Sequence, residues 1–381
     1  MRPSLPAHIR ATPGSGIRRI FEIALHMDPQ PIMLAVGEPD QPVAAHIREA
    51  ATAAWERDDT NYTPNGGIAV LRDAIVGKLA AVNGIAAERE QVWVTNGGVQ
   101  ALYQALTLTL AAGDEVLVPD PGYTTFTMGA HMLDAVPVPY ALLPENDFLP
   151  DFAALERSVT PRTRVIIVNS PSNPLGRVFP ADVVEQLVRF AERHDLWLIS
   201  DEVYEQFTYG EAHASAATFD RDGRVFTVFS LSKTYAMTGV RVGYLVTPFV
   251  LPATMQAVQE ATVSCIDTPA QYAALAALTG PQDAVDIARE HYRENLDAAL
   301  AALEGTGIRS LAPKGAFYLW LDVSHASGGD VAAWCEHFLA TQDVAVAPGS
   351  AFGASGEGWI RICLAAELDD IREGLARLPR P

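Results

Sequence analysis

Lysine is scarce in this sequence. Only Lys78, Lys233 and Lys314 occur among 381 residues, which leaves 24 arginines in a total of 27 basic side chains. With 46 Asp and Glu residues the formal net charge is -19. General binders of DNA, RNA or anionic membranes need a basic face, so we expect neither nucleic-acid nor membrane partners. Any anionic ligand must sit in a local group of arginine, lysine or backbone N–H groups.

The sequence also has few cysteines and no long apolar run. Cys265, Cys335 and Cys363 form no CxxC pair and no disulfide framework, which favours a reducing compartment. The nine histidines show no HxxH or HxxxH spacing, so we predict no metal site. No stretch approaches the ~20 apolar residues of a membrane span, and the first thirty residues lack a signal-peptide core. These absences predict a cytoplasmic protein.

The middle of the chain alternates between strand and helix patterns. We predict a helix over residues 67–82, with Asn65 as its cap and Asn83-Gly84 as its stop, and further helices from about residue 99 and over 181–194. Predicted strands cover residues 91–95, 115–119, 165–168, 196–200 and 225–229. This order is typical of a mostly parallel sheet covered by helices.

The end of the chain has a different pattern. A long helix is predicted over 284–303, strands over 316–322, 344–348 and 359–364, and helices over 331–341 and 368–378. We therefore expect a separate α+β layer. The predicted division is an N-terminal arm with part of the small domain (1–45), a large cofactor-binding domain (46–281) and a small C-terminal domain (282–381). The proline-rich arm has no core of its own, so it must pack against another part of the protein or a partner subunit.

Polar or small residues follow five predicted strands. In an open parallel sheet, ligands bind at the carboxyl ends of the strands. We expect five segments to converge on one crevice: 97–100, 120–123, 169–176, 201–204 and 230–233, with Arg241 shortly after. Lys233 is the most informative residue among them, because a buried lysine amine can form a Schiff base. The alternative is a surface lysine in a loop.

The other candidates each have a structural alternative. Asp201 and Tyr204 follow an apolar strand, where a buried carboxylate needs a cationic partner, although a helix cap and a core tyrosine would give the same pattern. Gly97-Gly98 at a helix start suits a phosphate, or only a tight turn. Asn173 between prolines is most simply a turn residue. Arg361 alternates with isoleucines, so it either faces solvent or clamps a carboxylate.

Taken together, these motifs resemble those of the class I/II aminotransferases, pyridoxal-phosphate enzymes of fold type I in the group that contains aspartate aminotransferase. The resemblance runs from about Gly37 to Arg361. Its motifs are Val36-Gly37-Glu38-Pro39, Asn61 to Gly66, Gly97-Gly98-Val99-Gln100-Ala101, Asn169 to Gly176, Ser200 to Tyr204, and Ser230 to Lys233 with Arg241. The implied fold is a large domain with a mostly parallel, seven-stranded type of sheet covered by helices, plus a smaller α+β domain.

The resemblance also implies roles for individual residues. Lys233 would hold pyridoxal 5'-phosphate and shuttle the proton, Asp201 would pair with the ring nitrogen, and Tyr204 with Asn173 would bind the ring 3-oxygen. Arg361 would grip the substrate carboxylate beside Gly37. The remaining implied contacts are those of Tyr123 with the ring face and substrate, of Gly98, Val99, Gln100, Ser230, Ser232 and Arg241 with the cofactor, and of Tyr62 with the phosphate of a neighbouring subunit in a homodimer.

The predicted activity is transfer of an amino group from an L-amino acid to a 2-oxo acid by a ping-pong mechanism. Some bacterial aspartate-specific relatives carry lysine where this chain has Val99, so we expect a neutral or aromatic donor more than a strictly acidic one. A carbon–sulfur β-lyase of the same fold would use the same cofactor residues. Two further alternatives are a non-catalytic cofactor-binding sensor, and a generic α/β protein in which Lys233 only binds an anion.

Overall fold

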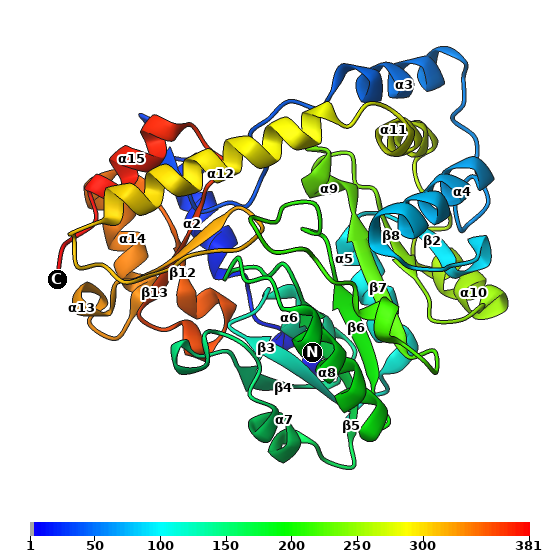
Figure 1. Ribbon diagram of the computed structural model, residues 1–381, viewed down its shortest axis with the longest axis horizontal. Helices are drawn as coiled ribbons and strands as arrows, with labels where there is room; N and C mark the ends of the chain where they lie inside the picture. Colours follow the sequence, from blue (N-terminus) through cyan, green and yellow to red (C-terminus); the bar gives the residue numbers. More distant parts are fainter. Residues whose placement is uncertain (1–3) are drawn as a thin grey trace.

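The computed structural model describes residues 4–381 and is built around a seven-stranded sheet (Figure 1). The strand order is β2-β8-β7-β6-β5-β3-β4, and every neighbouring pair is parallel except the two that involve β8. The strands are β2 (Val92–Thr95), β3 (Glu115–Asp120), β4 (Val136–Ala141), β5 (Thr163–Asn169), β6 (Trp197–Asp201), β7 (Val225–Ser230) and β8 (Gly243–Val246). The predicted α/β class is confirmed.

The central strands are apolar on both faces because helices cover both. Along β5, Ile166 and Val168 pack with α8 (Ala181–Arg193), whereas Val165 and Ile167 pack with α5 (Gly98–Thr109) and α6 (Thr125–Met132). A parallel sheet buried in this way reads as a continuous apolar run instead of an alternating one. The sequence prediction found five of these strands, β2, β3, β5, β6 and β7. It missed β4, whose two prolines disguise the pattern, and β8.

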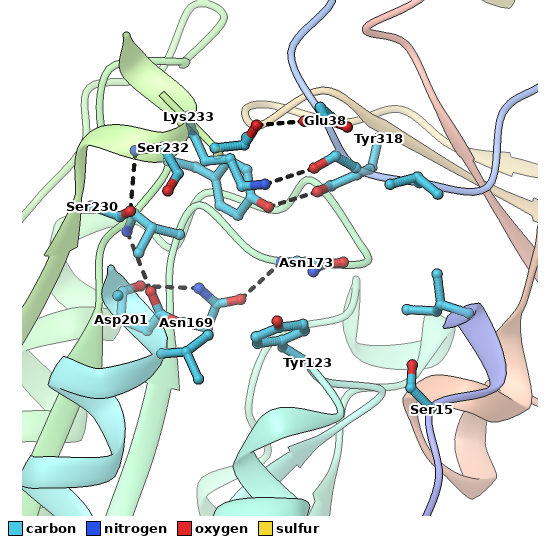
Figure 2. A pocket seen from close by; sticks show the side chains of 18 of the residues that line it. Ser15, Glu38, Tyr123, Asn169, Asn173, Asp201, Ser230, Ser232, Lys233 and Tyr318 are labelled. Carbon is cyan, nitrogen blue, oxygen red and sulfur yellow. Dashed lines mark hydrogen bonds between the residues drawn. The ribbon is translucent and has the colours of Figure 1, made fainter. Parts of the chain in front are cut away.

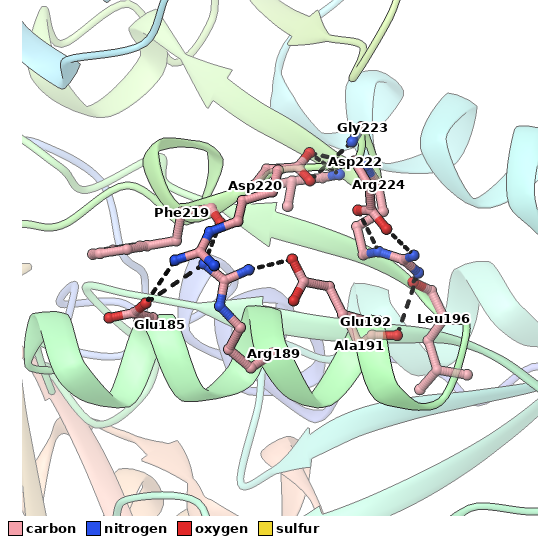
Figure 3. A network of polar contacts seen from close by, with 12 residues as sticks. Glu185, Arg189, Ala191, Glu192, Leu196, Phe219, Asp220, Asp222, Gly223 and Arg224 are labelled. Atoms are coloured by element: carbon pink, nitrogen blue, oxygen red, sulfur yellow. Dashed lines mark hydrogen bonds and ion pairs between the residues drawn. The ribbon is translucent and has the colours of Figure 1, made fainter.

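An arginine network joins the end of α8 to the start of β7 (Figure 3). Arg224, just before β7, donates to the carbonyl oxygen of Ala191 in the last turn of α8 (3.3 Å) and to that of Leu196 just before β6 (2.9 Å). Asp220 accepts hydrogen bonds from the backbone N–H groups of Gly223, Arg224 and Val225. These contacts tie the segment before β7 to the segment between α8 and β6. They fix the start of β7, the strand that ends beside Lys233.

A second, smaller sheet has the order β12-β13-β10-β9 and is antiparallel. Its strands are β9 (Ser310–Leu311), β10 (Tyr318–Asp322), β12 (Ala347–Pro348) and β13 (Trp359–Cys363). The predicted strand over 344–348 is wrong as one element, because β11 (Val344–Ala345) pairs instead with β1 (Ile32–Met33). The predicted strand 316–322 starts late because Ala316 has a φ of +56°.

Helices enclose the second sheet and join it to the first. Figure 1 shows α12 (Asp283–Leu303) running along the molecule from α15 (Leu368–Ala376) toward α11 (Thr268–Thr279). The remaining helices are α3 (Ala45–Glu56), α7 (Phe152–Ser158), α9 (Leu231–Thr234), α10 (Pro252–Thr262), α13 (Ser324–Ser327) and α14 (Val331–Gln342). Within residues 4–381, none of the helices combines the length and apolarity that crossing a membrane requires.

The N-terminal arm packs against another part of the protein, one of the two outcomes that we expected. After α1 (Ala7–Ala11), α2 (Gly16–Leu25) buries Ile20 and Ala24 in the apolar cluster of the second sheet. The prediction for Asn65 is wrong. Asn65 does not cap the next predicted helix. That helix is α4 (Ala69–Lys78), and the N–H of Ile68, which precedes it, donates to the side chain of Gln271 at 2.8 Å.

Lys78 lies at the end of the helix predicted over 67–82. It ends α4, where a turn of π-helix (Leu79–Asn83) continues to Gly84, and its amine is buried against the carboxylate of Glu205. The amine lies 4.5 Å from the ring centre of Phe229, which adds a cation–π contact. These two contacts give Lys78 a structural role.

Candidate active site

A cavity of about 400 Å³ lies at the carboxyl ends of β5, β6 and β7, where they face β10, β13 and α2 (Figure 2). Twelve of the predicted site residues line it. They are Gly37, Gly98, Val99, Tyr123, Asn173, Asp201, Tyr204, Ser230, Ser232, Lys233, Arg241 and Arg361. The cavity thus collects side chains from both sheets, as the strand-end rule predicts.

Lys233 lies on the short helix α9, directly after β7. Its Nζ donates to the backbone carbonyl oxygen of Gly37 at 2.6 Å, across the cavity from its own sheet. Burial lowers the pKa of Lys233 to about 8, and the nearby Arg361 and Arg241 charges act in the same direction. A sizeable fraction of the amine is therefore unprotonated at neutral to slightly basic pH, which is what a nucleophilic lysine needs.

Asp201 ends β6, and its buried carboxylate has few polar partners to offset the loss of water. Its carboxylate accepts one hydrogen bond, from the N–H of Val203 at 3.3 Å, and no cation contacts it within residues 4–381. Burial raises the pKa of Asp201 to about 7. A buried carboxylate without a partner is costly, so this position suits a ligand that brings positive charge. The helix-cap alternative is wrong, because Asp201 is in the strand.

Arg361, on β13, is buried and enclosed by two aromatic rings. The centre of its guanidinium lies 4.2 Å from the ring centre of Tyr318 and 4.9 Å from that of Phe352. One terminal nitrogen donates to Oδ1 of Asn173 at 2.8 Å, and the other to the carbonyl oxygen of Ala35. In the described part of the chain no carboxylate pairs with it, and its Nε has no hydrogen-bond partner. A planar anion such as a carboxylate fits this site.

An anion cradle lies at the start of α5. Gly97 has a φ of +81°, and the first N–H groups of the helix, those of Gly98 and Val99, have no partner within the helix. A Cβ on Gly97 would come 2.3 Å from the Arg241 guanidinium, so glycine is required for this close approach. Arg241 also reaches the hydroxyl of Ser232 at 3.4 Å. Helix N–H groups beside an arginine attract a phosphate.

Four aromatic and amide side chains complete the cavity: Tyr123, Asn173, Tyr204 and Tyr318. The hydroxyl of Tyr204 lies 2.6 Å from that of Tyr318, and burial raises the pKa of Tyr204 well above its ordinary value. The ring of Tyr123 projects into the cavity opposite these residues (Figure 2). Asn173 is held by its N–H, which donates to Oδ1 of Asn169 at 2.8 Å. It therefore does more than form a turn.

Comparison with known proteins agrees with this geometry. The family described as Aminotransferase class I and II matches residues 29–378. The chain belongs to the class I and II aminotransferases. It is 37% identical over 352 residues to the aspartate/prephenate aminotransferase of Thermus thermophilus, which covers 92% of this chain and 90% of that protein.

Two further relatives agree. The aromatic-amino-acid aminotransferase 2 of Thermococcus litoralis is 35% identical over 371 residues, or 96% of this chain and 95% of that one. The structure of aspartate aminotransferase from Thermus thermophilus with maleate superposes with a TM-score of 0.93 at 36% identity, covering 99% of both chains. As an aminotransferase, the protein is a transferase that uses pyridoxal phosphate, with an amino acid and a 2-oxo acid as substrates.

The residues of this aminotransferase fit that cofactor. A nucleophilic amine, a buried carboxylate without a cation and an anion cradle occupy one cavity. They match the aldehyde, the ring nitrogen and the phosphate of pyridoxal phosphate. The fit rests on their chemistry: within residues 4–381 the Asp201 carboxylate has no cation in contact with it, and the cradle N–H groups have no partner within the helix.

Two predicted site residues are not brought to the cavity of this aminotransferase chain. The Gln100 side chain accepts from the N–H of Asn96 at 2.5 Å and donates to Thr262 at 3.2 Å, so it stabilises the turn and does not line the cavity. Its predicted cofactor contact stays a prediction, and its side chain does not support it. Tyr62 is 91% exposed and lies away from the cavity of its own chain.

The sequence prediction missed several cavity residues. Asn169 was part of a recognised motif without an assigned role, and it holds Asn173. Tyr318 in an apolar strand looks like an ordinary core residue, and only its partners reveal more. The side chains from α2 and the turn before it, Ser15, Ile17, Arg18 and Phe21, carry no motif at all.

Proposed function

We propose that Lys233 and Asp201 form the chemical centre of this aminotransferase. The Lys233 amine would hold the cofactor covalently and would serve as the group that moves the proton at the substrate α-carbon. Bound pyridoxal phosphate supplies an electron sink for the α-carbon. The Asp201 carboxylate keeps the ring nitrogen protonated, which its buried position without another cation favours.

The other cavity residues hold the cofactor and substrate in this proposal. The N–H groups of Gly98 and Val99 bind the phosphate with Arg241, and Ser230 and Ser232 offer hydroxyls to the same group. Their place around the start of α5 supports this assignment.

Ring and carboxylate contacts come from the opposite walls. Tyr204 and Asn173 donate to the phenolic oxygen of the ring, and Tyr123 stacks on its face. Arg361 binds the substrate α-carboxylate bidentately beside Gly37, and Tyr123 and Asn173 also border the substrate. The enclosure of an unpaired guanidinium between two rings supports this assignment.

The amino donor in our proposal has a neutral side chain, preferably aromatic. The observation that carries this proposal is the apolar wall that Ile17, Phe21, Val99 and Leu102 contribute to the cavity. Arg18 is the one cation on this wall; it is exposed and lies 5.3 Å from the ring centre of Phe21. Relatives named for aspartate/prephenate and for aromatic amino acids both occur, so the family alone does not choose between acidic and aromatic donors.

A half-reaction screen tests this preference. Each amino acid is mixed with the holoenzyme without an acceptor, and loss of the visible absorbance of the bound cofactor is followed. We expect kcat/KM in the order phenylalanine and tyrosine, then leucine, then aspartate. A clear preference for aspartate would overturn the proposal. Release of pyruvate and ammonia from an S-substituted cysteine without an acceptor would instead favour the β-lyase.

We also propose a homodimer with shared active sites. The segment that holds Trp55, Tyr62 and Val70 exposes 63%, 91% and 54% of these side chains, which is unusual for residues of this size and supports burial against a second copy. Mixing a Tyr62→Ala chain with a Lys233→Ala chain should restore one intact site per hybrid dimer. Activity no higher than that of the two separate variants would contradict a shared site.

The division into domains is part of the same proposal. Residues 46–281 form the large domain, and residues 282–381 form the small domain with part of the segment 1–45. The placement of α2 on the second sheet and of α3 on α11 supports this boundary.

A further inference from the structure

Tyr318 contacts three of the groups to which the proposal above assigns roles. Its hydroxyl lies 2.6 Å from that of Tyr204, and its ring lies under the guanidinium of Arg361 at 4.2 Å. A Cβ on Gly37 would come 2.0 Å from the Tyr318 hydroxyl, so the loop that accepts the Lys233 amine is packed directly on it. Figure 2 shows Tyr318 at the wall of the cavity, and Tyr204 also lines it.

The hydroxyl pair has two protons and one contact. Burial raises the pKa of both Tyr204 and Tyr318 above the ordinary value, so each hydroxyl stays protonated at neutral pH. One proton lies in the contact between them, and only the hydroxyl that accepts there can donate elsewhere. If Tyr318 donates, the proton of Tyr204 is free for an oxygen in the cavity.

We propose that Tyr318 is a positioning residue whose hydroxyl and ring each position a different group. Its hydroxyl donates to Tyr204 and thereby directs the Tyr204 proton to the phenolic oxygen of the bound pyridoxal ring, while its ring supports Arg361 for binding the substrate carboxylate. This inference rests on the role proposed above for Tyr204. A hydrogen bond received by Tyr204 also makes it a stronger donor, since consecutive hydrogen bonds polarise one another.

The first experiment measures the pKa of the bound cofactor from its visible absorbance in the substrate-free holoenzyme. A hydrogen bond from Tyr204 draws charge from the phenolic oxygen, so its loss makes the Lys233 nitrogen hold its proton more tightly. Tyr204→Phe should raise this pKa by about one unit, and Tyr318→Phe by roughly half a unit to one unit. The double variant should equal Tyr204→Phe, because Tyr318 acts through Tyr204.

A matched control is Tyr209→Phe. Tyr209 is a part-buried tyrosine, and its hydroxyl donates to the carbonyl oxygen of Ala316 and not to Tyr204. It should leave the cofactor pKa unchanged. No shift in Tyr318→Phe beside a clear shift in Tyr204→Phe would overturn the inference alone. No shift in Tyr204→Phe would overturn the proposed role of Tyr204 and this inference with it.

The second experiment separates the ring from the hydroxyl. The dissociation constant of 3-phenylpropanoate, a carboxylate without an amino group, is measured from its effect on the cofactor absorbance. Tyr318→Phe keeps the ring and should stay within about twofold of the wild-type value. Tyr318→Leu removes the cation–π contact and should weaken binding roughly three- to thirtyfold. Equal weakening in both variants, or none in Tyr318→Leu, would contradict the ring's part in the proposal.

Discussion

The Nζ of Lys233 donates to the carbonyl oxygen of Gly37 at 2.6 Å, although the two residues are 196 positions apart. Lys233 follows the large sheet, and Gly37 lies in the loop after β1, which pairs with β11 beside the second sheet. The two parts of the molecule therefore meet at the amine to which we assign the chemistry in our proposal.

Replacement of Lys233 should abolish the chemistry and leave the fold intact. Lys233→Ala removes both the covalent attachment and the proton carrier, so kcat should fall by at least about a thousandfold. Borohydride reduction followed by mass spectrometry should find the cofactor on Lys233 in the wild-type protein and no covalent cofactor in the variant. Lys314→Arg, at an exposed lysine, is the control and should keep full activity. Covalent cofactor in Lys233→Ala would contradict the assignment.

Asp201 should give the cofactor-free protein a pH-dependent stability. Because burial raises its pKa from 3.8 to about 7, the folded state holds a proton that the unfolded state has lost between those values. Stability must therefore fall as pH rises from about 4 to about 7, by about 2–4 kcal/mol from this group. Bound cofactor should remove this loss, since its ring nitrogen supplies the missing positive charge.

Calorimetry of the cofactor-free protein and the holoenzyme at several pH values checks this prediction. Asp201→Asn cannot ionise, so it should flatten the decline in the cofactor-free protein. Asp195→Asn changes a fully exposed carboxylate and should leave the slope as it is. An equal slope in the wild type and Asp201→Asn would show that Asp201 is not the group responsible.

Arg361 should be required for every amino donor. Arg361→Lys keeps the charge but loses the planar fork and much of the stacking between Tyr318 and Phe352. We expect kcat/KM to fall about a hundredfold or more for phenylalanine, leucine and aspartate alike. Arg309→Lys is a matched control, because Arg309 also lies over an aromatic ring, that of Trp359, but outside the cavity. A loss confined to one donor would argue against a role with the shared α-carboxylate.

The sequence alone predicted that Lys233, Asp201 and Asn173 lie in one cavity. Each lies at or just after the end of a buried strand, and neighbouring parallel strands bring their carboxyl ends to one edge of the sheet. Tyr318 could not be found in this way. An aromatic residue in an apolar strand packs in the core in most proteins, and its contacts with Tyr204 and Arg361 depend on how the second sheet faces the first.

Predictions from the local sequence were wrong or incomplete where the partner of a residue comes from a distant part of the chain. Asn65 has the residue type of a helix cap, yet the side chain of Gln271, over 200 positions later, takes that place at Ile68. Lys78 lies at the end of its helix, and only the fold brings Glu205 to it. Neither partner can be inferred from the neighbouring sequence.

Arg224 should stabilise the fold without affecting chemistry directly. Its guanidinium, in a side chain only 14% exposed, donates to the carbonyl oxygen of Ala191 in the last turn of α8 and to that of Leu196 just before β6, and it pairs with Asp222. Arg224→Ala removes both hydrogen bonds and the ion pair, so the free energy of unfolding should fall by about 1–3 kcal/mol in urea. Arg221→Ala, at a neighbouring exposed arginine, should change it by less than about 0.5 kcal/mol. Equal effects of the two variants would contradict this stabilising role.

Val99 should help to set the choice between neutral and acidic donors. It is the second residue of α5, 43% exposed, and its side chain borders the cavity while its backbone N–H faces the anion cradle. Val99→Lys keeps that N–H and adds a cation at the apolar wall, where the second carboxylate of aspartate can pair with it. We expect kcat/KM for aspartate relative to phenylalanine to rise about tenfold, as one partly exposed charge pair allows. Val82→Lys adds the same charge at an exposed position outside the cavity and should leave the ratio unchanged. The same rise in both variants would mean that the overall charge of this acidic protein causes the effect. No rise in Val99→Lys would mean that another residue determines the choice of donor, and Arg18 is the first candidate.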